Sequence, residues 1–416
     1  MAGTRAAQAA PFSSLIDLQC ARCGTAWPAD AIAQLCSCGS PLLARYDVSL
    51  AARTLTRENL ARRPRDLWRY HELLPVRDPA RIVAIGESVT PLTRLDKLGN
   101  ALGLAHLYIK DEGLLPGGSF KARGAAVGVS RARELGVSAF AMPTNGNAGA
   151  AWSLYAAKAG LQAHIVMPAR APQLSRSACA LAGARVYSVN GLINDAGKIV
   201  AKAVAKYGLY DASTLKEPYR IEGKKTLGFE IAEQCGWEPP DVIVYPTGGG
   251  VGLIGMQRAF RELAEAGLLK PRMPRFIAVQ SSGCAPIVRA WEQGDAVSTQ
   301  WEGANTVAFG INVPKALGDF LILRILKECA GAAIAVDDAD ILRYQSLLAQ
   351  REGIYASPEG GAALAAVVDL LRSGTVSRDE RIVLVNTGSG ALESGGIPAV
   401  IPVLEPDDEI SIPASL

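Results

Sequence analysis

The sequence predicts an α/β protein with two doubly wound open sheets and a small cysteine-containing segment at its amino terminus. Short apolar runs alternate with helix-like stretches along most of the chain, which is typical of parallel sheets covered by helices. Loops rich in glycine and asparagine follow several of these runs, and ligand sites form at the carboxyl ends of parallel strands. The 416 residues, 49% of them hydrophobic, are enough for two lobes that each bury a core.

The first segment, residues 1–45, is expected to form a ribbon-like appendage. Cys20 and Cys23 are separated by two residues, and Cys36 and Cys38 by one. Two facing turns of this kind can present four thiolates tetrahedrally to zinc. The second pair has the poorer spacing, so a structural zinc ion and a metal-free ribbon of reduced thiols both remain open.

Strand and helix signals then alternate to about residue 402. The expected strands are 139–142, 163–168, 183–189, 242–244, 276–280 and 381–385, and the expected helices include 125–135, 253–264 and 359–371. From this order we expect three parts besides the appendage: a larger lobe from 46–125 and 241–402, a smaller mobile lobe from 126–240, and a tail at 403–416.

Lys121 is the residue that points most directly to chemistry. It lies in residues 117–124 (GGSFKARG), where flanking glycines leave room for a carbonyl cofactor held as a Schiff base. Such a lysine needs a lowered pKa, which burial or a nearby cation such as Arg123 can provide. The alternative is that Lys121 and Arg123 are solvated charges at the start of a helix.

Three further loops have the composition of cofactor-binding loops. They are residues 143–150 (PTNGNAGA), 245–252 (YPTGGGVG) and 386–390 (NTGSG), each directly after an apolar run. The first two precede helix-like stretches, so free backbone amides and the helix dipole favour anions there. Each loop alone is a weak signal, because such turns also occur where nothing binds.

The order of the lysine loop and these three loops resembles that of the fold type II pyridoxal phosphate enzymes, the tryptophan synthase β-like group. The resemblance extends from about Gly86 to Glu393. Within the group the chain is most similar to the threonine synthases, through residues 217–226 (EPYRIEGKKT), 86–92 (GESVTPL), 110–113 (KDEG) and 279–287 (VQSSGCAPI).

The resemblance implies a role for each matching residue. Lys121 would hold pyridoxal 5'-phosphate and act as the general base, Asn147 would bond its 3-hydroxyl, and Thr387 would meet its ring nitrogen. The cofactor phosphate would lie on the backbone amides of Gly248, Gly249, Gly250, Val251 and Gly252. The expected substrate-binding residues are Ser119, Thr144, Asn145 and Gly146, with Lys110, Arg123 and Lys224 as cations for a substrate phosphate.

The implied reaction is that of threonine synthase, which converts O-phosphohomoserine and water to threonine and phosphate. Residues 115, 117 and 122, which are polar in threonine synthases, are Leu115, Gly117 and Ala122 here, and we expect this to weaken recognition of a phosphorylated substrate. A serine/threonine ammonia-lyase and another β-replacement enzyme, such as a cysteate synthase-like one, therefore remain alternatives. A non-catalytic sensor of cofactor or amino acid is the alternative outside the enzymes.

Composition excludes several other classes of function. The net charge of +3 is too small to indicate nucleic-acid or membrane binding, and no apolar run approaches the length of a membrane span. His71, His106 and His164 do not cluster, which argues against a histidine-based hydrolase. We expect a cytoplasmic enzyme whose substrate is a small amino acid, and the family resemblance implies a homodimer.

Overall fold

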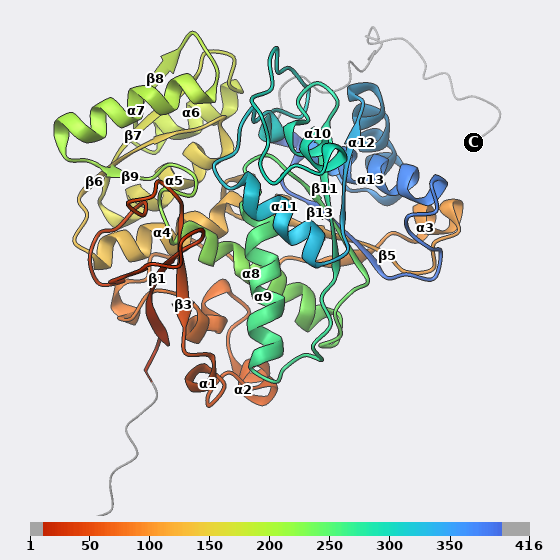
Figure 1. Cartoon of the computed structure of the whole chain (residues 1–416), viewed down its shortest axis with the longest axis horizontal. Coiled ribbons are helices and arrows are strands. Elements are labelled where there is room, and N and C mark those ends of the chain that lie inside the picture. The colour runs from red at the N-terminus through yellow and green to blue at the C-terminus, as the bar shows by residue number, and fades with distance from the viewer. Residues whose placement is uncertain (1–10, 393–416) are drawn as a thin grey trace, which may run out of the picture.

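Two open sheets and a small antiparallel ribbon organise the chain, of which the computed structural model describes residues 11–392 (Figure 1). The predicted α/β class with two sheet-bearing lobes and an appendage is confirmed. Residues 1–10 of the appendage, the end of the predicted larger lobe and the tail 403–416 lie outside the described residues.

The larger sheet has six strands, and all of its neighbouring strands run parallel except β4 and β5. In order across the sheet the strands are β12 (Ala332–Val336), β11 (Arg275–Ser281), β10 (Val242–Pro246), β13 (Ile382–Asn386), β5 (Leu107–Asp111) and β4 (Leu92–Arg94). The expected strands 242–244, 276–280 and 381–385 are thus present, each slightly longer or shifted by one residue.

Helices cover both faces of this sheet because its central strands are apolar on both sides. Val242 and Val244 of β10 pack with α3 (Asp96–Leu102), α12 (Asp338–Glu352) and α13 (Pro358–Arg372). The alternate residues Ile243 and Tyr245 pack on the other face, with α8 (Arg220–Gln234), α9 (Val251–Glu265) and α11 (Asp319–Glu328). Helix α10 (Pro286–Gln293) lies beside β11 and β12.

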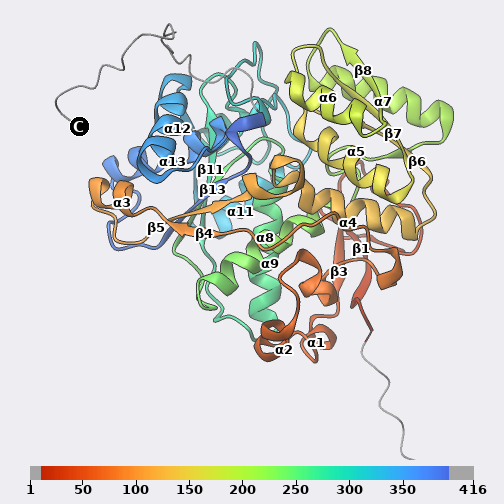
Figure 2. The ribbon, with the colours of Figure 1, turned by 180° about the vertical axis from the view of Figure 1, so that it is seen from behind.

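The smaller sheet is fully parallel, in the order β8 (Arg185–Val189), β7 (Gln162–Pro168), β6 (Ala139–Pro143) and β9 (Tyr210–Asp211). One face packs on α4 (Lys121–Glu134), α5 (Asn147–Ala159) and α6 (Gln173–Leu181), and the other on α7 (Ile193–Tyr207), as Figure 2 shows from behind. Phe140 and Met142 of β6 face the first group, whereas Ala141 faces α7.

The amino-terminal ribbon consists of β1 (Leu15–Cys20), β2 (Ala26–Trp27) and β3 (Leu42–Tyr46), paired antiparallel in the order β2-β1-β3. Leu18 and Ala44 of the ribbon share one hydrophobic cluster with α8 and α9, so the appendage is packed on the body of the protein. Short helices lead from it to β4: α1 (Val48–Ala51), α2 (Arg57–Arg62), η1 (Leu67–Leu73) and η2 (Pro79–Arg81).

Helix α8 differs from the predicted division of the chain. The range 126–240 assigned it to the smaller lobe, but the smaller sheet ends at Asp211 and α8 packs against α9 of the larger one. It also contacts α4, so it lies at the centre of the molecule in Figure 1.

Among residues 11–392, no helix combines the length and the hydropathy that a membrane crossing requires.

Candidate active site

A cavity of about 490 Å³ lies where loops at the carboxyl ends of strands from both sheets meet. Its walls include the loops after β6, β10 and β13, the start of α4, part of α7 and the segment that follows η5 (Phe309–Ile311). Predicted residues that line it are Lys121, Thr144, Asn145, Gly146, Asn147, Gly248, Gly249, Gly250, Val251 and Thr387. The structure therefore brings together four segments that are far apart in the sequence.

Lys121 is the first residue of α4 and is half-buried in the cavity wall. Its Nζ lies 4.0 Å from the centre of the Phe120 ring. Burial lowers the pKa of Lys121 to about 8; the carboxylate of Glu359 opposes this shift and the guanidinium of Arg220 adds to it. An amine with this pKa is neutral often enough near pH 7 to act as a nucleophile or base.

The lysine loop is anchored to the loop after β13. Gly117 and Gly118 have φ of +71° and +70°, left-handed values that glycine adopts without strain. The turn they form allows Ser119 to pair with Gly388, and Phe120 N donates to Thr387 O at 3.0 Å. Lys121 and Thr387 are thereby held on the same side of the cavity.

The loop after β6 presents the amino-terminal end of α5. The hydroxyl of Thr144 accepts hydrogen bonds from Gly146 N (2.9 Å) and Gly149 N (3.1 Å), which shapes the loop. Gly146 has φ of +140°, and a Cβ there would lie 2.8 Å from Ser175 Oγ, so no other residue fits without rearrangement. The free amides at the start of α5 can hold a carboxylate.

The side chains of Asn145 and Asn147 have different surroundings. Asn145 Nδ2 donates to the carbonyls of Phe309 (3.3 Å) and Asn312 (3.1 Å), so this amide ties the loop to the larger lobe. Asn147 Oδ1 accepts from Ser175 Oγ at 3.1 Å. Asn147 also lines the cavity, as the role expected for it requires.

The triple-glycine loop forms a cradle at the start of α9. Gly250 has φ of +71°, and a Cβ there would overlap the side chain of Ile322. A Cβ on Gly248 would lie 3.0 Å from Gly310 O. Gly252 is not part of the cavity lining; a Cβ there would overlap the Tyr245 hydroxyl beneath the cradle. The cradle and the helix amino terminus together are suited to a phosphate.

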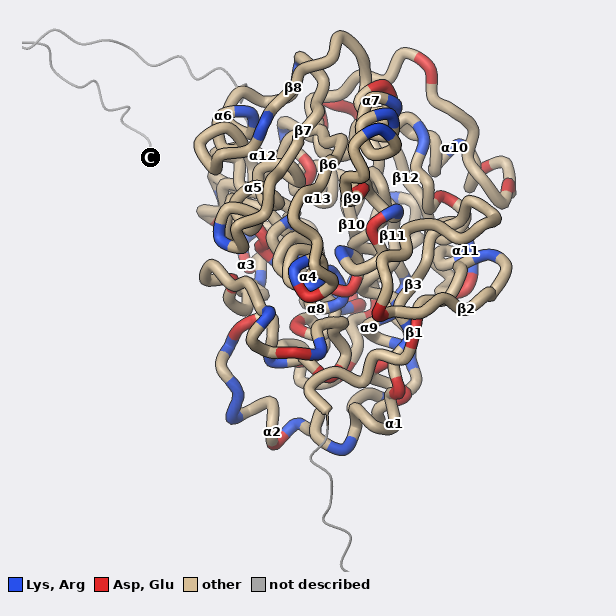
Figure 3. The backbone as a smooth tube through the Cα atoms, turned by 90° about the vertical axis from the view of Figure 1, so that its left-hand side faces the viewer, with Lys and Arg blue, Asp and Glu red and all other residues tan. Residues whose placement is uncertain are grey.

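Lys110 and Arg123, predicted to bind the substrate phosphate, lie in the protein interior and not in the cavity wall. Both side chains are fully buried and pair with acids: Lys110 Nζ lies 2.7 Å from Glu230 Oε2, and Arg123 Nη2 lies 2.8 Å from both Glu112 Oε1 and Glu230 Oε2. Neither lines the cavity. Their assignment to the substrate is corrected: they belong to an ion-pair network beneath the site, where both signs of charge meet around α4 and α8 (Figure 3).

Lys224 and Ser119 lie behind the cavity wall. Lys224 Nζ donates to Phe120 O (2.6 Å) and Lys121 O (3.3 Å), so this side chain supports the backbone of the lysine loop. Burial, and then the charges of Lys121 and Arg220, hold the pKa of Lys224 well below its usual value. Ser119 is buried, and its hydroxyl has no hydrogen-bond partner among the described residues.

Glu359, in the cavity lining, and the buried Arg220, directly behind that lining, are residues that the sequence argument did not assign. Arg220 Nη1 donates to Thr214 Oγ1 at 2.9 Å, while Nη2 has no hydrogen-bond partner among residues 11–392. Thr214 and the neighbouring Ser213 line the cavity. Glu359 also lines it and accepts from Gly310 N at 2.8 Å. Arg220 belongs to residues 217–226, which the sequence argument quoted for the family resemblance. A role in binding a ligand is indicated only by the structure, where its Nη2 has no hydrogen-bond partner among the described residues.

The three residues that replace polar ones do not face the cavity. Leu115 and Ala122 are buried in the hydrophobic cluster around α4 and α5, and Gly117 provides the turn before Lys121. The expectation that these residues weaken substrate recognition therefore has no support in the geometry.

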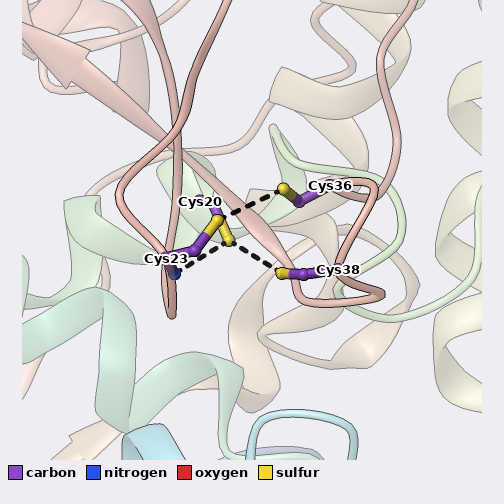
Figure 4. Close-up of side chains that lie close together, drawn as sticks. All are labelled: Cys20, Cys23, Cys36 and Cys38. Atoms are coloured by element: carbon purple, nitrogen blue, oxygen red, sulfur yellow. Dashed lines mark hydrogen bonds between the residues drawn. The ribbon is translucent and has the colours of Figure 1, made fainter.

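The predicted metal ligands lie together in the appendage. Cys20 and Cys23 from the end of β1 face Cys36 and Cys38 from the following loop, and their four Sγ atoms lie within 4.8 Å of one another (Figure 4). No disulfide joins them. The cluster can hold a metal ion, although it takes no part in the cavity.

The cavity fits pyridoxal phosphate by its own features. Lys121 provides an amine with a lowered pKa, and the glycines of the cradle, where a Cβ would overlap neighbouring protein atoms at Gly250, leave the backbone amides open to an anion. Asn147 and Thr387 line the space between them with an amide and a neutral hydroxyl. All three groups face one cavity of about 490 Å³, large enough for the cofactor together with a small amino acid.

Comparisons with known proteins identify the family of the chain. A family model described as pyridoxal-phosphate dependent enzyme matches residues 83–388. The threonine synthase of Methanocaldococcus jannaschii is 35% identical over 89% of this chain and 92% of its own length, and that of Methanosarcina acetivorans is 37% identical over 89% and 91%.

Solved structures show the same fold at lower identity. Maize serine racemase superposes with a TM-score of 0.63 at 22% identity, covering 72% of this chain and 88% of its own. Diaminopropionate ammonia lyase from Escherichia coli superposes with a TM-score of 0.64 at 20% identity, covering 74% of this chain and 85% of its own. With the family match over residues 83–388, the chain belongs to the pyridoxal-phosphate dependent enzymes, in their fold type II branch and close to the threonine synthases.

Proposed function

We propose that this protein is a threonine synthase, which converts O-phosphohomoserine and water to threonine and inorganic phosphate. The observation that carries the proposal is the match to curated threonine synthases at 35% and 37% identity over about nine tenths of both lengths. The cavity supports it, because Lys121 lines it and Arg220, whose Nη2 has no hydrogen-bond partner among the described residues, lies behind Thr214 of its lining.

The cofactor-binding residues in this proposal are Lys121 and those of the three loops after β6, β10 and β13. The amides of Gly248, Gly249, Gly250 and Val251 hold the phosphate, with Asn147 at the 3-hydroxyl and Thr387 at the ring nitrogen. Pyridoxal phosphate, when bound, supplies the electron sink for a negative charge at the α carbon of the substrate. The neutral hydroxyl of Thr387 leaves the ring nitrogen largely unprotonated.

Lys121 moves the protons. Its amine, with a pKa lowered to about 8 by burial, takes the α-proton of the substrate as a general base. Lys224 holds the backbone carbonyls of Phe120 and Lys121, which fixes the start of α4 and so the position from which the amine acts.

Two anion sites orient the substrate. The amides at the start of α5, shaped by Thr144 and Gly146, receive the α-carboxylate. Arg220, directly behind Thr214 of the cavity lining, receives the substrate phosphate through its unpaired Nη2, together with the hydroxyl of Thr214. A guanidinium matches the paired oxygens of a phosphate and remains charged throughout.

Purified protein loaded with pyridoxal phosphate tests the proposal when it is mixed with O-phosphohomoserine, and phosphate and threonine are measured together. Equal amounts of both products are expected, and the Lys121→Ala variant should form neither. Serine and threonine are run in parallel, with keto acid as the product measured. Keto acid from either, with no phosphate from O-phosphohomoserine, would identify an ammonia-lyase instead.

We also propose a homodimer in the cytoplasm. The homodimer rests on the family resemblance, and light scattering on the eluted protein tests it. The proposal of a cytoplasmic location is supported by the cysteines: all eight lie within the described residues and none is in a disulfide, as is usual for proteins of a reducing compartment.

A further inference from the structure

The four cysteines of the ribbon have the geometry of a tetrahedral thiolate site. Cys20 Sγ lies 3.5 Å from Cys38 Sγ, and Cys23 Sγ lies 3.6 Å from Cys36 Sγ. Tetrahedral zinc with Zn–S bonds of about 2.3 Å separates its sulfurs by roughly 3.8 Å. The pairs are therefore spaced for a shared ion, and they are too far apart for the S–S bond of a disulfide, about 2.05 Å.

The loop between the two cysteine pairs, residues 24–35, contacts both ends of one wall of the active site. Gln34 Nε2 donates to Asp211 O at 2.6 Å, and Tyr219 Oη donates to Ala29 O at 2.8 Å. We call residues 211–220 the anion wall, since Ser213 and Thr214 within it line the cavity and its last residue is Arg220.

The same loop also contacts the helix that begins at the catalytic lysine. Arg131 of α4 donates to Ala29 O at 2.9 Å and pairs with Asp30 at 2.9 Å. The carbonyl of Ala29 thus accepts from α4 and from Tyr219, which directly precedes α8. This loop therefore bridges the start of α8 and Arg131 of α4, in addition to the direct contacts between the two helices.

We propose that Cys20, Cys23, Cys36 and Cys38 bind zinc, and that this ion, by ordering residues 24–35, positions the anion wall for a phosphorylated substrate. The loop has one strand of two residues, β2, and its ends are the two cysteine pairs, so the ion is its main internal restraint. The role of the wall in substrate binding rests on the proposed function, whereas the zinc site and its effect on the wall do not.

Metal analysis of the purified, reduced protein gives the first test. One zinc per chain is expected in the wild type and much less than one in Cys38→Ser, whose side chain is exposed and whose loss should be tolerated by the fold. Cys235→Ser, outside the cluster, is the matched control and should keep its zinc. A wild type without metal, with iron, or with disulfides among these cysteines would overturn the assignment.

Hydrogen exchange tests whether the metal site affects the anion wall. Peptides that cover residues 211–220 should exchange faster in Cys38→Ser and in chelator-treated wild type than in the zinc-bound protein, while peptides from β13 should not change. Equal exchange in both states would overturn the coupling even if zinc is bound. This readout needs no substrate, so it is independent of the identity of the reaction.

Tyr219→Phe separates the bracing contact from the metal. It removes the hydrogen bond to Ala29 O but keeps the ring that packs on Arg131. We expect normal zinc content, normal cofactor binding and a KM for O-phosphohomoserine raised about twofold to tenfold, the effect of one lost hydrogen bond, with a smaller change in kcat. An unchanged KM would contradict the role of this contact. Inactivity of every variant and of the wild type would instead refute the proposed function.

Discussion

At the scale of single residues, the proposed role of Arg220 as the phosphate ligand leads to a direct test. A buried guanidinium nitrogen without a partner is costly unless a ligand pairs with it. Arg220→Gln should therefore raise KM for O-phosphohomoserine by about tenfold to hundredfold, the range expected for a charged hydrogen bond. Arg220→Lys should recover part of the loss. Steady-state kinetics, with inhibition by inorganic phosphate as a second readout, measures both.

A control for this prediction is an arginine outside the cavity. The half-buried Arg289 lies over Trp301 and does not line the cavity, and Arg289→Gln should leave KM unchanged. If Arg220→Gln and Arg289→Gln behaved alike, Arg220 would be a structural residue and the phosphate would bind elsewhere.

The pKa of Lys121 predicts how cofactor attachment depends on pH. The neutral amine reacts with a carbonyl, so in apoprotein the attachment rate should rise by about tenfold per pH unit below 8 and level off above it. Glu359 raises the pKa of Lys121, so Glu359→Gln should move the midpoint to lower pH. The amide can still accept from Gly310 N, which preserves the loop.

Stopped-flow absorbance of apoprotein mixed with pyridoxal phosphate measures this profile. Nα-acetyl-lysine, an amine with an ordinary pKa, shows in parallel how much of the profile is the cofactor's own titration. Glu302→Gln, an exposed carboxylate, should leave the midpoint in place. A midpoint that moved to higher pH in Glu359→Gln would contradict the arrangement.

At the scale of elements, the phosphate cradle depends on glycine for two separate reasons. Gly250 has a left-handed φ of +71°, and its Cβ would also overlap Ile322. Gly267 has φ of +74° but open space around it. Gly267→Ala should therefore show only the backbone cost, about 1–2 kcal/mol, with normal cofactor affinity.

Gly250→Ala should be destabilised further and should bind pyridoxal phosphate at least about tenfold more weakly, because the side chain displaces the cradle. Titration followed by absorbance gives the dissociation constant, and urea unfolding gives the stability. Equal cofactor affinity in the two variants would mean that the cradle does not hold the phosphate.

The strands and loops were predictable because their signals are local. Apolar runs that end in glycine-rich turns were sufficient to predict β6, β10 and β13 and the loops that carry Asn147 and Thr387. Strand β12 was not predicted, since three of its five residues are alanine and only Ile334 and Val336 are the β-branched residues that mark a buried strand. The alternation of strand and helix signals along the chain also could not show that α8 packs on α9, because it does not indicate which helices are neighbours in space.

The errors at the site have a different cause. Whether a cation binds substrate or a buried acid depends on partners distant in sequence, and Glu230 lies 120 residues from Lys110. Composition near Lys110 and Arg123 therefore could not distinguish a phosphate ligand from an internal ion pair. The same limit hid Arg220, whose significance lies in the partner that one of its nitrogens lacks.

At the scale of the whole molecule, the ion-pair network beneath the site connects its central elements. Glu230 of α8 pairs with Lys110 of β5 and with Arg123 of α4, the helix that begins at Lys121. Burial alone would raise the pKa of Glu230, but Arg123 and Lys110 lower it to about 2. Removing one charge from such a group leaves the others buried and unpaired.

Glu230→Gln should accordingly reduce the apparent free energy of unfolding by about 3–5 kcal/mol near pH 7, whereas Glu328→Gln on the surface should change it little. The folded pKa of Glu230 lies below its ordinary value of 4.5, so its stabilisation is complete above pH 4.5 and is lost as pH falls towards 2. Urea unfolding of wild type and variant between pH 7 and pH 3 measures this. Their difference should be constant down to about pH 4.5 and then shrink; a difference that stayed constant to pH 3 would mean that the ionised carboxylate is not what holds α8 to α4 and β5.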